Sequence, residues 1–346
     1  MSLLTKLNGG MSFVLNLWRE LPRRAKIGAV VLGLFILAGI IGPMVAPYDP
    51  AYQNPSPALS LQPPSAQYLL GTTQTGQDVL SQLLSGIRLT LELAFLVGVI
   101  ATGLSVLVGV TSAFLGGVWD EVLSLITNVF LVIPPLPLLI LLLGYLPGRG
   151  QLPTIVVLAG LGWQWGARVV RAQTLTIRNR DFIAASRESG EKSWRIIIFE
   201  IIPNEVSLIA ASFVSTVLYA IGASVALAFI GLADLNSWSL GTMLYWSQAG
   251  QALQLGAWWW FLPPGIAVAL IGTALVLLNT GFDELGSPRL RASRGSARIA
   301  GHRVWATDPT PVLQQLIGSP SRVYAFLHSF SRSSLLENTP AGGELG

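Results

Sequence analysis

Hydrophobic residues gather in six long blocks along the chain, and polar segments separate the blocks. The blocks, which hold few or no Asp, Glu, Lys or Arg, are residues 27–47, 87–113, 122–146, 152–170, 206–232 and 258–282. A hydrocarbon core about 30 Å thick needs roughly 20 apolar residues per helix. The pattern therefore predicts an all-α polytopic membrane protein with six transmembrane helices.

The composition agrees with this prediction. Of 346 residues, 52% are hydrophobic and 11% are charged, and the mean hydropathy is +0.60. A soluble domain carries about 25% charged residues. The first block follows Arg23, Arg24 and Lys26. It is too long for a secretory signal core and lacks a small-residue cleavage site, so it is expected to stay as an anchor.

The distribution of lysine and arginine predicts the orientation of the spans. With the N-terminus inside, 19 of the 21 basic residues fall in cytoplasmic segments, and only Arg88 and Arg149 lie outside. Cytoplasmic loops of membrane proteins carry such an excess. Both termini are therefore expected in the cytoplasm. The formal net charge of +4 is too small an excess to indicate a nucleic-acid partner.

The residue inventory excludes several kinds of chemistry. The chain has no cysteine, and its two histidines, His302 and His328, lie near the C-terminus. A histidine or cysteine metal centre and a histidine-based nucleophile triad are thus excluded from the main body. No Gly-Lys dipeptide exists, so the chain has no phosphate-binding loop of its own.

Ionisable residues are nearly absent from the predicted spans. Glu92 follows Arg88 by four residues, which predicts a local ion pair near the outer surface. An ion-driven carrier usually needs ionisable groups deep in its bundle. The sequence therefore disfavours a secondary transporter, which stays as the alternative, and it offers no catalytic dyad for a membrane-embedded enzyme.

Two short motifs bear on helix geometry. The third block contains Ile133-Pro-Pro-Leu-Pro137, which must break or bend the helix because each proline removes a backbone donor. Gly162-Trp-Gln-Trp-Gly166 has a spacing of small residues that lets helices approach closely. On the outer side, Trp238 and Trp246 are expected as interface anchors rather than a carbohydrate platform.

The polar segment 171–205 has the pattern of two short helices around a glycine. Asp181 to Ser189 is a helix former, and Gly190 supplies a permissive backbone at its end. A second, largely apolar helix runs to Ile202, where Pro203 ends it. From composition alone, the segment is equally well interpreted as a pair of amphipathic helices that lies on the inner leaflet of the membrane.

Three stretches of the chain resemble one family. DFIAASRESG at 181–190, with WRII at 194–197 and IPN at 202–204, resembles the EAA loop of ABC-importer permeases of the oligopeptide and dipeptide (DppC/OppC) type. LGTTQTGQDVLS at 70–81 is similar to that family's outer signature LGTDxxGRDVLSR, and DELGSPRLR at 283–291 to its closing stretch. The resemblance covers roughly residues 26–291.

The chain departs from the family pattern at four positions. Ala184 stands where the loop has its glutamate, and Ser186 where it has the second alanine. In the outer signature, Thr73 replaces an aspartate and Gln77 an arginine. A charged contact with an ATPase would then be missing, or would be replaced by Glu188 or Glu191.

The resemblance implies an ABC type I importer permease fold and a non-catalytic subunit in the inner membrane of a bacterial or archaeal cell. The expected partners are the lipid bilayer, a sister permease in a heterodimer, two cytoplasmic ATPase subunits that bind ATP and Mg, and an extracytoplasmic solute-binding protein. The expected regions are a cytoplasmic segment 1–26, a permease domain 27–291 with an outer loop 48–86, and a basic, disordered tail 292–346 with one possible amphipathic helix at 310–331.

The resemblance also marks the ATPase-docking residues. They are Asp181, Ala184, Ala185, Arg187 and Gly190, supported by Ile197, Ile202 and Pro203. Small residues permit close approach, the arginine can pair with an acidic groove edge, and the glycine makes the turn. Cargo stays open between oligopeptides and oligosaccharides, whereas nickel is disfavoured because no histidine or cysteine lies in the spans.

Overall fold

The computed structural model describes residues 21–286 except 55 and 147–149, together with 297–299 and 302–304. The chain divides into two units, one ending at Gly286 and one beginning at Ser287. The second unit contains a short antiparallel hairpin of β1 (Ala297–Ile299) and β2 (His302–Val304). The helix predicted at 310–331 and most of segment 1–26 lie outside the described residues.

Four helices of the first unit are each long and apolar enough to cross a membrane. They are α2 (Arg23–Val45), α3 (Val79–Leu115), α11 (Val206–Phe229) and α13 (Trp258–Gly286). They coincide with the first, second, fifth and sixth predicted spans, and α3 begins eight residues earlier than predicted because Asp78 caps it: its carboxylate accepts a hydrogen bond from the Ser81 amide at 2.8 Å.

The third predicted span is broken, as the prolines predicted. α4 (Gly117–Val132) and α5 (Pro135–Tyr145) meet at an angle of 91° across Ile133 and Pro134. Pro134 has an extended backbone (ψ 120°), and Pro135 begins the new helix, where a missing N–H costs nothing.

The fourth predicted span is also divided, which the sequence pattern did not predict. α6 (Gln151–Gly160) and α7 (Gln164–Arg178) are separated by three residues. Within this break the indole Nε1 of Trp163 donates to the Gly160 carbonyl at 3.0 Å and so occupies an acceptor left over at the helix end. The described residues thus offer four spans, or five with the bent pair, and the count of six stays a prediction.

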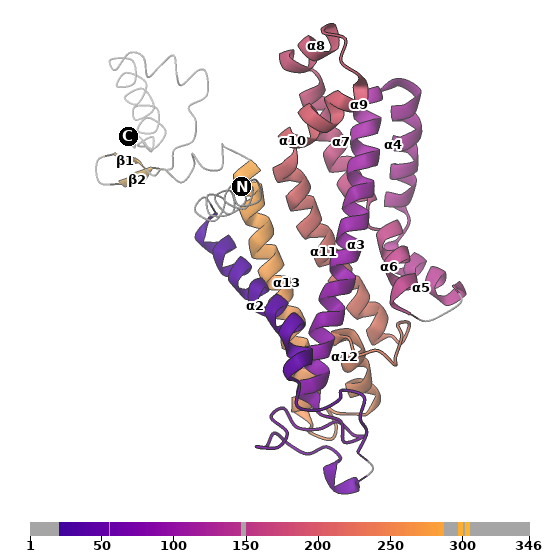
Figure 1. Cartoon of the computed structure of the whole chain (residues 1–346), viewed down its shortest axis with the longest axis vertical. Helices are drawn as coiled ribbons and strands as arrows, with labels where there is room; N and C mark the ends of the chain where they lie inside the picture. Colours follow the sequence, from indigo (N-terminus) through magenta and orange to yellow (C-terminus); the bar gives the residue numbers. More distant parts are fainter. Residues whose placement is uncertain (1–20, 55, 147–149, 287–296, 300–301, 305–346) are drawn as a thin grey trace, which may run out of the picture. The chain divides into compact units, whose positions relative to one another are not determined.

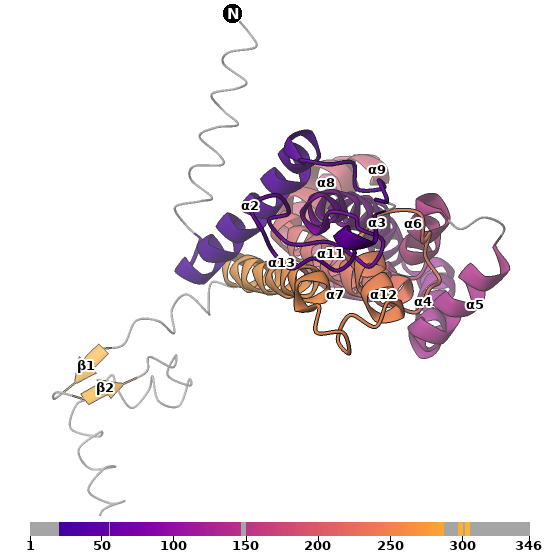
Figure 2. The ribbon, with the colours of Figure 1, turned by 90° about the horizontal axis from the view of Figure 1, so that it is seen from below.

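α3 forms the centre of the bundle and packs against α2, α7 and α11 (Figures 1 and 2). Its contact with α7 is close because glycines lie on both sides. A Cβ at Gly109 would lie 2.7 Å from the Ala167 carbonyl oxygen, and one at Gly166 would lie 2.6 Å from Ser105 Oγ. The close approach predicted for the Gly162–Gly166 motif is therefore confirmed at Gly166.

Uncharged side chains supply several of the hydrogen bonds that fold the segment between α2 and α3. Gln77, which replaces the family arginine, is buried, and its Oε1 accepts from Gln82 Nε2 and Thr75 Oγ1, both at 3.0 Å. The indole of Trp259 donates to the Thr72 carbonyl at 3.2 Å, which ties α13 to this segment.

One predicted ion pair near the outer surface is wrong. The side chains of Arg88 and Glu92 are both exposed, and neither belongs to an ion pair within the described part of the chain.

Candidate functional site

The predicted helix–glycine–helix segment is present between α7 and α11, where it projects beyond the ends of the long helices (Figure 1). It consists of α8 (Asp181–Glu188), α9 (Ser193–Ile196), the π-helical turn η2 (Ile197–Ile201) and α10 (Ile202–Asn204). Gly190 has φ +78°, a left-handed backbone that other residues adopt only under strain. The predicted glycine turn is confirmed.

Three isoleucines fasten this segment, hereafter the coupling segment, to the bundle. Ile183, Ile196 and Ile201 are 0–1% exposed and join a cluster with residues of α3 and α7, among them Phe114 and Val170. The π-helical turn explains why Ile196 and Ile201 are both buried, because residues five positions apart fall on nearly the same face of such a turn. The sequence prediction missed these anchors, because the apolar run of 196–202 does not show which of its residues face the bundle.

The predicted docking residues are exposed to solvent. Asp181, Ala184, Ala185, Arg187 and Gly190 are all exposed. Of the residues predicted to support them, Ile197 and Ile202 are half-buried, whereas Pro203 is exposed. The small side chains of α8 therefore leave its outer surface open to close approach.

The coupling segment also exposes three large aromatic side chains. Phe182, Trp194 and Phe199 are 45%, 57% and 66% exposed. Exposed aromatic residues are typical of interaction surfaces. The sequence analysis did not predict these three residues as part of the site. The only sign of them in the sequence is that the segment has more apolar residues than its anchoring to the bundle requires.

Polar side-chain contacts within the coupling segment stabilise its fold. Ser186 Oγ donates to Glu200 Oε1 at 2.6 Å, and Arg195 pairs with Glu191 at 2.9 Å. The guanidinium of Arg187 lies 4.7 Å from the centre of the Phe114 ring. Arg187 is therefore stacked on α3, and Glu191, one of the two possible substitutes for the missing glutamate, already has a partner.

Glu205 lies where the coupling segment joins α11. Its side chain is buried, and its Oε1 accepts a hydrogen bond from Thr174 of α7 at 2.8 Å. Burial raises the pKa of this carboxyl group to about 7, and the hydrogen bond from Thr174 opposes the rise. The carboxyl group is thus near the midpoint of its titration at neutral pH.

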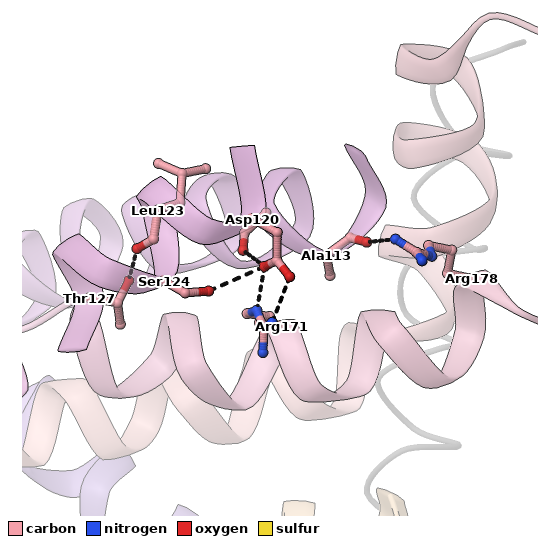
Figure 3. A network of polar contacts seen from close by, with 8 residues as sticks. Ala113, Asp120, Leu123, Ser124, Thr127, Arg171 and Arg178 are labelled. Carbon is pink, nitrogen blue, oxygen red and sulfur yellow. Dashed lines mark hydrogen bonds and ion pairs between the residues drawn. The ribbon is translucent and has the colours of Figure 1, made fainter. Parts of the chain in front are cut away.

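A polar network links α7 to α3 and α4 below the segment (Figure 3). Arg171 Nε and Nη2 donate to Asp120 Oδ1 and Oδ2 at 2.6 and 2.7 Å. Arg178 Nη1 donates to the Ala113 carbonyl at 2.6 Å. Because α7 leads directly into α8, these bonds connect the coupling segment to the broken α4–α5 helix pair.

Two family models match the chain. Residues 105–292 match the binding-protein-dependent transport system inner membrane component, and residues 22–64 match the N-terminal TM domain of oligopeptide transport permease C. The first match covers more than half of the chain and includes the whole coupling segment.

Several proteins are similar over most of their length. The chain is 32% identical to the oligopeptide transport system permease protein OppC of Mycobacterium tuberculosis H37Rv, over 81% of this chain and 96% of that protein. It is 31% identical to the dipeptide transport system permease protein DppC of Bacillus subtilis, over 81% of this chain and 87% of that protein.

Among solved structures, an inward-facing MetNI methionine ABC transporter aligns with 22% identity and a TM-score of 0.41, over 61% of this chain and 95% of the matched chain. The two family matches and the relatives lead to one assignment. The chain belongs to the family of binding-protein-dependent transport system inner membrane components.

Proposed function

We propose that this chain is the transmembrane permease subunit of an ATP-driven, solute-binding-protein-dependent importer of oligopeptides or dipeptides. In this proposal it has six spans with both termini in the cytoplasm. It forms half of the pathway beside a sister permease, and two cytoplasmic ATPase subunits bind ATP and Mg. The names of its relatives favour peptides over oligosaccharides as cargo.

The observation that carries the proposal is the two-sided build of the coupling segment. One side is held on α3 and α7 by the buried Ile183, Ile196 and Ile201. Its exposed surface presents the small residues of α8 and several aromatic side chains. A segment that is fixed to the bundle and open outward can pass a push from a docked partner to the helices behind it.

In this mechanism, closure of the ATPase pair on ATP moves the coupling segments. α7 and α11 flank the segment in the chain and would move with it. The bidentate contact of Arg171 with Asp120 would carry the movement to α4. The bundle would then exchange between inward-open and outward-open states, driven by the difference in binding energy of the two states.

The test is co-purification of the ATPase from detergent extracts, with ATP hydrolysis assayed on the eluate. Gly190→Trp places a bulky residue at an exposed position of φ +78°, and Gly256→Trp is its matched control, with φ +71° and likewise no atom within 4 Å of an added Cβ. We expect wild type and Gly256→Trp to retain the ATPase and Gly190→Trp to lose it. Wild-type eluates without ATPase activity would contradict the proposal and favour an ion-driven carrier.

A further inference from the structure

A pocket of about 430 Å³ lies among the helices that flank the coupling segment. α4, α5, α7, α11 and α13 contribute to its wall, together with the break between α6 and α7. Both helix breaks border it, through Pro135 at one and Leu161 and Gly162 at the other. Irregular backbone at membrane depth is tolerated where it lines a cavity, and broken helices frequently form the substrate sites of transporters.

Three of the residues that line this pocket each carry a buried polar atom without a hydrogen-bond partner within the described part of the chain. The atoms are Gln164 Oε1 on α7, the Tyr219 hydroxyl on α11 and Asn279 Oδ1 on α13. A buried polar atom that stays unpaired destabilises the folded state. Their gathering from three separate helices into one cavity indicates that something else supplies the partners.

The chemistry of the lining limits which kind of molecule can supply these hydrogen-bond partners. Ser212, Ser215 and Thr216 add three hydroxyl groups, while Phe130, Trp165 and other apolar residues complete the wall. The lining contains no Asp, Glu, Lys, Arg or His. The pocket therefore offers neutral donors and acceptors on an apolar background, without a charge that would select for or against a charged side chain.

We propose that this pocket is a passage site that binds the main chain of a translocated peptide through Gln164, Tyr219 and Asn279. This inference rests on the proposed function and names the cargo contacts within it. A peptide main chain offers one N–H and one C=O at most residues, whatever the side chain. A side-chain amide can both donate to and accept from such groups, and apolar walls accommodate varied side chains.

The position of the pocket links this binding to the coupling segment. Gln164 is the first residue of α7, whose other end leads into α8, and Tyr219 lies on α11, which follows the segment directly. Asn279 lies on α13, away from the segment in the chain. A push on the segment would move two of the three polar groups relative to the third, and so release the main chain.

Thiol labelling tests the site directly, because the chain contains no cysteine. Ser215→Cys places a thiol at an exposed position of the pocket, and Ala58→Cys places one at an exposed position outside it, between α2 and α3. The whole transporter, reconstituted with its binding protein, is treated with a membrane-impermeant maleimide during turnover. The cysteine-free chain reports background labelling of the partners.

We expect penta-alanine to slow labelling of Ser215→Cys at least threefold and to leave labelling of Ala58→Cys unchanged, whereas cellopentaose slows neither. Equal labelling of Ser215→Cys with and without penta-alanine, in vesicles that import it, would overturn the passage site while leaving the proposed function intact. Protection by cellopentaose instead would overturn the peptide assignment. Vesicles that import no peptide and hydrolyse no ATP would contradict the proposed function itself.

A second measurement separates cargo binding from a merely structural role. Tyr219→Phe removes only the unpartnered hydroxyl, and Tyr145→Phe removes one from an exposed tyrosine outside the pocket. Loss of one neutral hydrogen bond predicts a three- to tenfold slower uptake of penta-alanine per ATPase. Uptake equal to that of Tyr145→Phe would contradict the role of Tyr219.

Discussion

Arg171 holds Asp120 through two parallel hydrogen bonds of 2.6 and 2.7 Å, although 51 positions separate the two residues. The aspartate also accepts from Ser112 and Ser124, so its carboxylate gathers donors from α3, α4 and α7. Planar bidentate contacts of this kind fix orientation as well as distance. The pair therefore sets how α7, which leads into the coupling segment, lies against the start of the broken third span.

Breaking this ion pair is expected to destabilise the protein. Arg171→Met leaves the Asp120 carboxylate without its main partner, and the side chains are only 34% and 23% exposed. We expect a loss of about 1–3 kcal/mol, less than for a fully buried pair, because solvent still reaches both groups. Thermal unfolding of the detergent-solubilised protein, followed by tryptophan fluorescence, measures it.

The double variant Asp120→Asn/Arg171→Met is the control for that prediction. It removes both charges, so it should recover part of the lost melting temperature. A single variant that melts with wild type would show that the pair contributes nothing to stability.

The close packing of α3 on α7 predicts opposite effects for two glycines of one helix. Gly109→Ala would place a Cβ 2.7 Å from the Ala167 carbonyl oxygen, so α7 must shift, at a cost of about 1–3 kcal/mol. Gly103→Ala meets no atom within 4 Å and should leave stability equal or higher, because alanine favours helix. Melting temperatures of the two variants check this, and a lower value for Gly103→Ala would contradict it.

Glu205 predicts a pH dependence of stability. Its pKa is raised from 4.5 to about 7 in the folded chain by burial, so the folded state holds the proton more tightly than the unfolded state. The stability from this group is full below about pH 4.5 and is lost as the pH rises to about 7. Between pH 5 and 8 the melting temperature of wild type should therefore fall more than that of Glu205→Gln.

Glu205→Gln keeps an acceptor for the Thr174 hydroxyl and removes only the titration. Thr174→Val, which removes a hydrogen bond that favours the carboxylate, should move the loss of stability to higher pH. Parallel pH profiles for wild type and Glu205→Gln would show that the carboxyl group does not titrate in this range.

The two faces of the coupling segment should respond differently to truncation. Ile201→Ala removes a fully buried anchor and should cost about 2–4 kcal/mol. Phe199→Ala removes a side chain that is 66% exposed and should leave stability nearly unchanged while weakening ATPase retention. Melting temperature and co-purified ATPase, measured on both variants, separate the effects, and a destabilised Phe199→Ala would contradict the assignment of its face.

Much of this architecture follows from the sequence. Four long apolar blocks became single helices, the prolines at 134 and 135 produced the break, and Gly190 produced the turn, because length, a missing donor and a positive φ are local properties. The break at 161–163 depends on where the Trp163 indole finds an acceptor. That is a tertiary choice that hydropathy does not encode.

In the coupling segment, too, some features follow from the sequence and others depend on tertiary contacts. Its position and its small, exposed residues could be predicted by resemblance. Which isoleucines anchor it depends on the π-helical turn, whose register the apolar run of 196–202 leaves undetermined. The stacking of Arg187 on Phe114 joins residues 73 positions apart and has no sequence signature.

Site-directed cross-linking tests most directly whether the coupling segment contacts an ATPase. Ala185→Cys, exposed on α8, and Ala58→Cys, exposed between α2 and α3, each carry a maleimide-linked photo-cross-linker in the otherwise cysteine-free chain within the whole transporter. We expect an adduct with the ATPase subunit from Ala185→Cys alone, and its yield should change when ATP is added. No adduct from Ala185→Cys in a complex that retains its ATPase, or an equal adduct from Ala58→Cys, would contradict it.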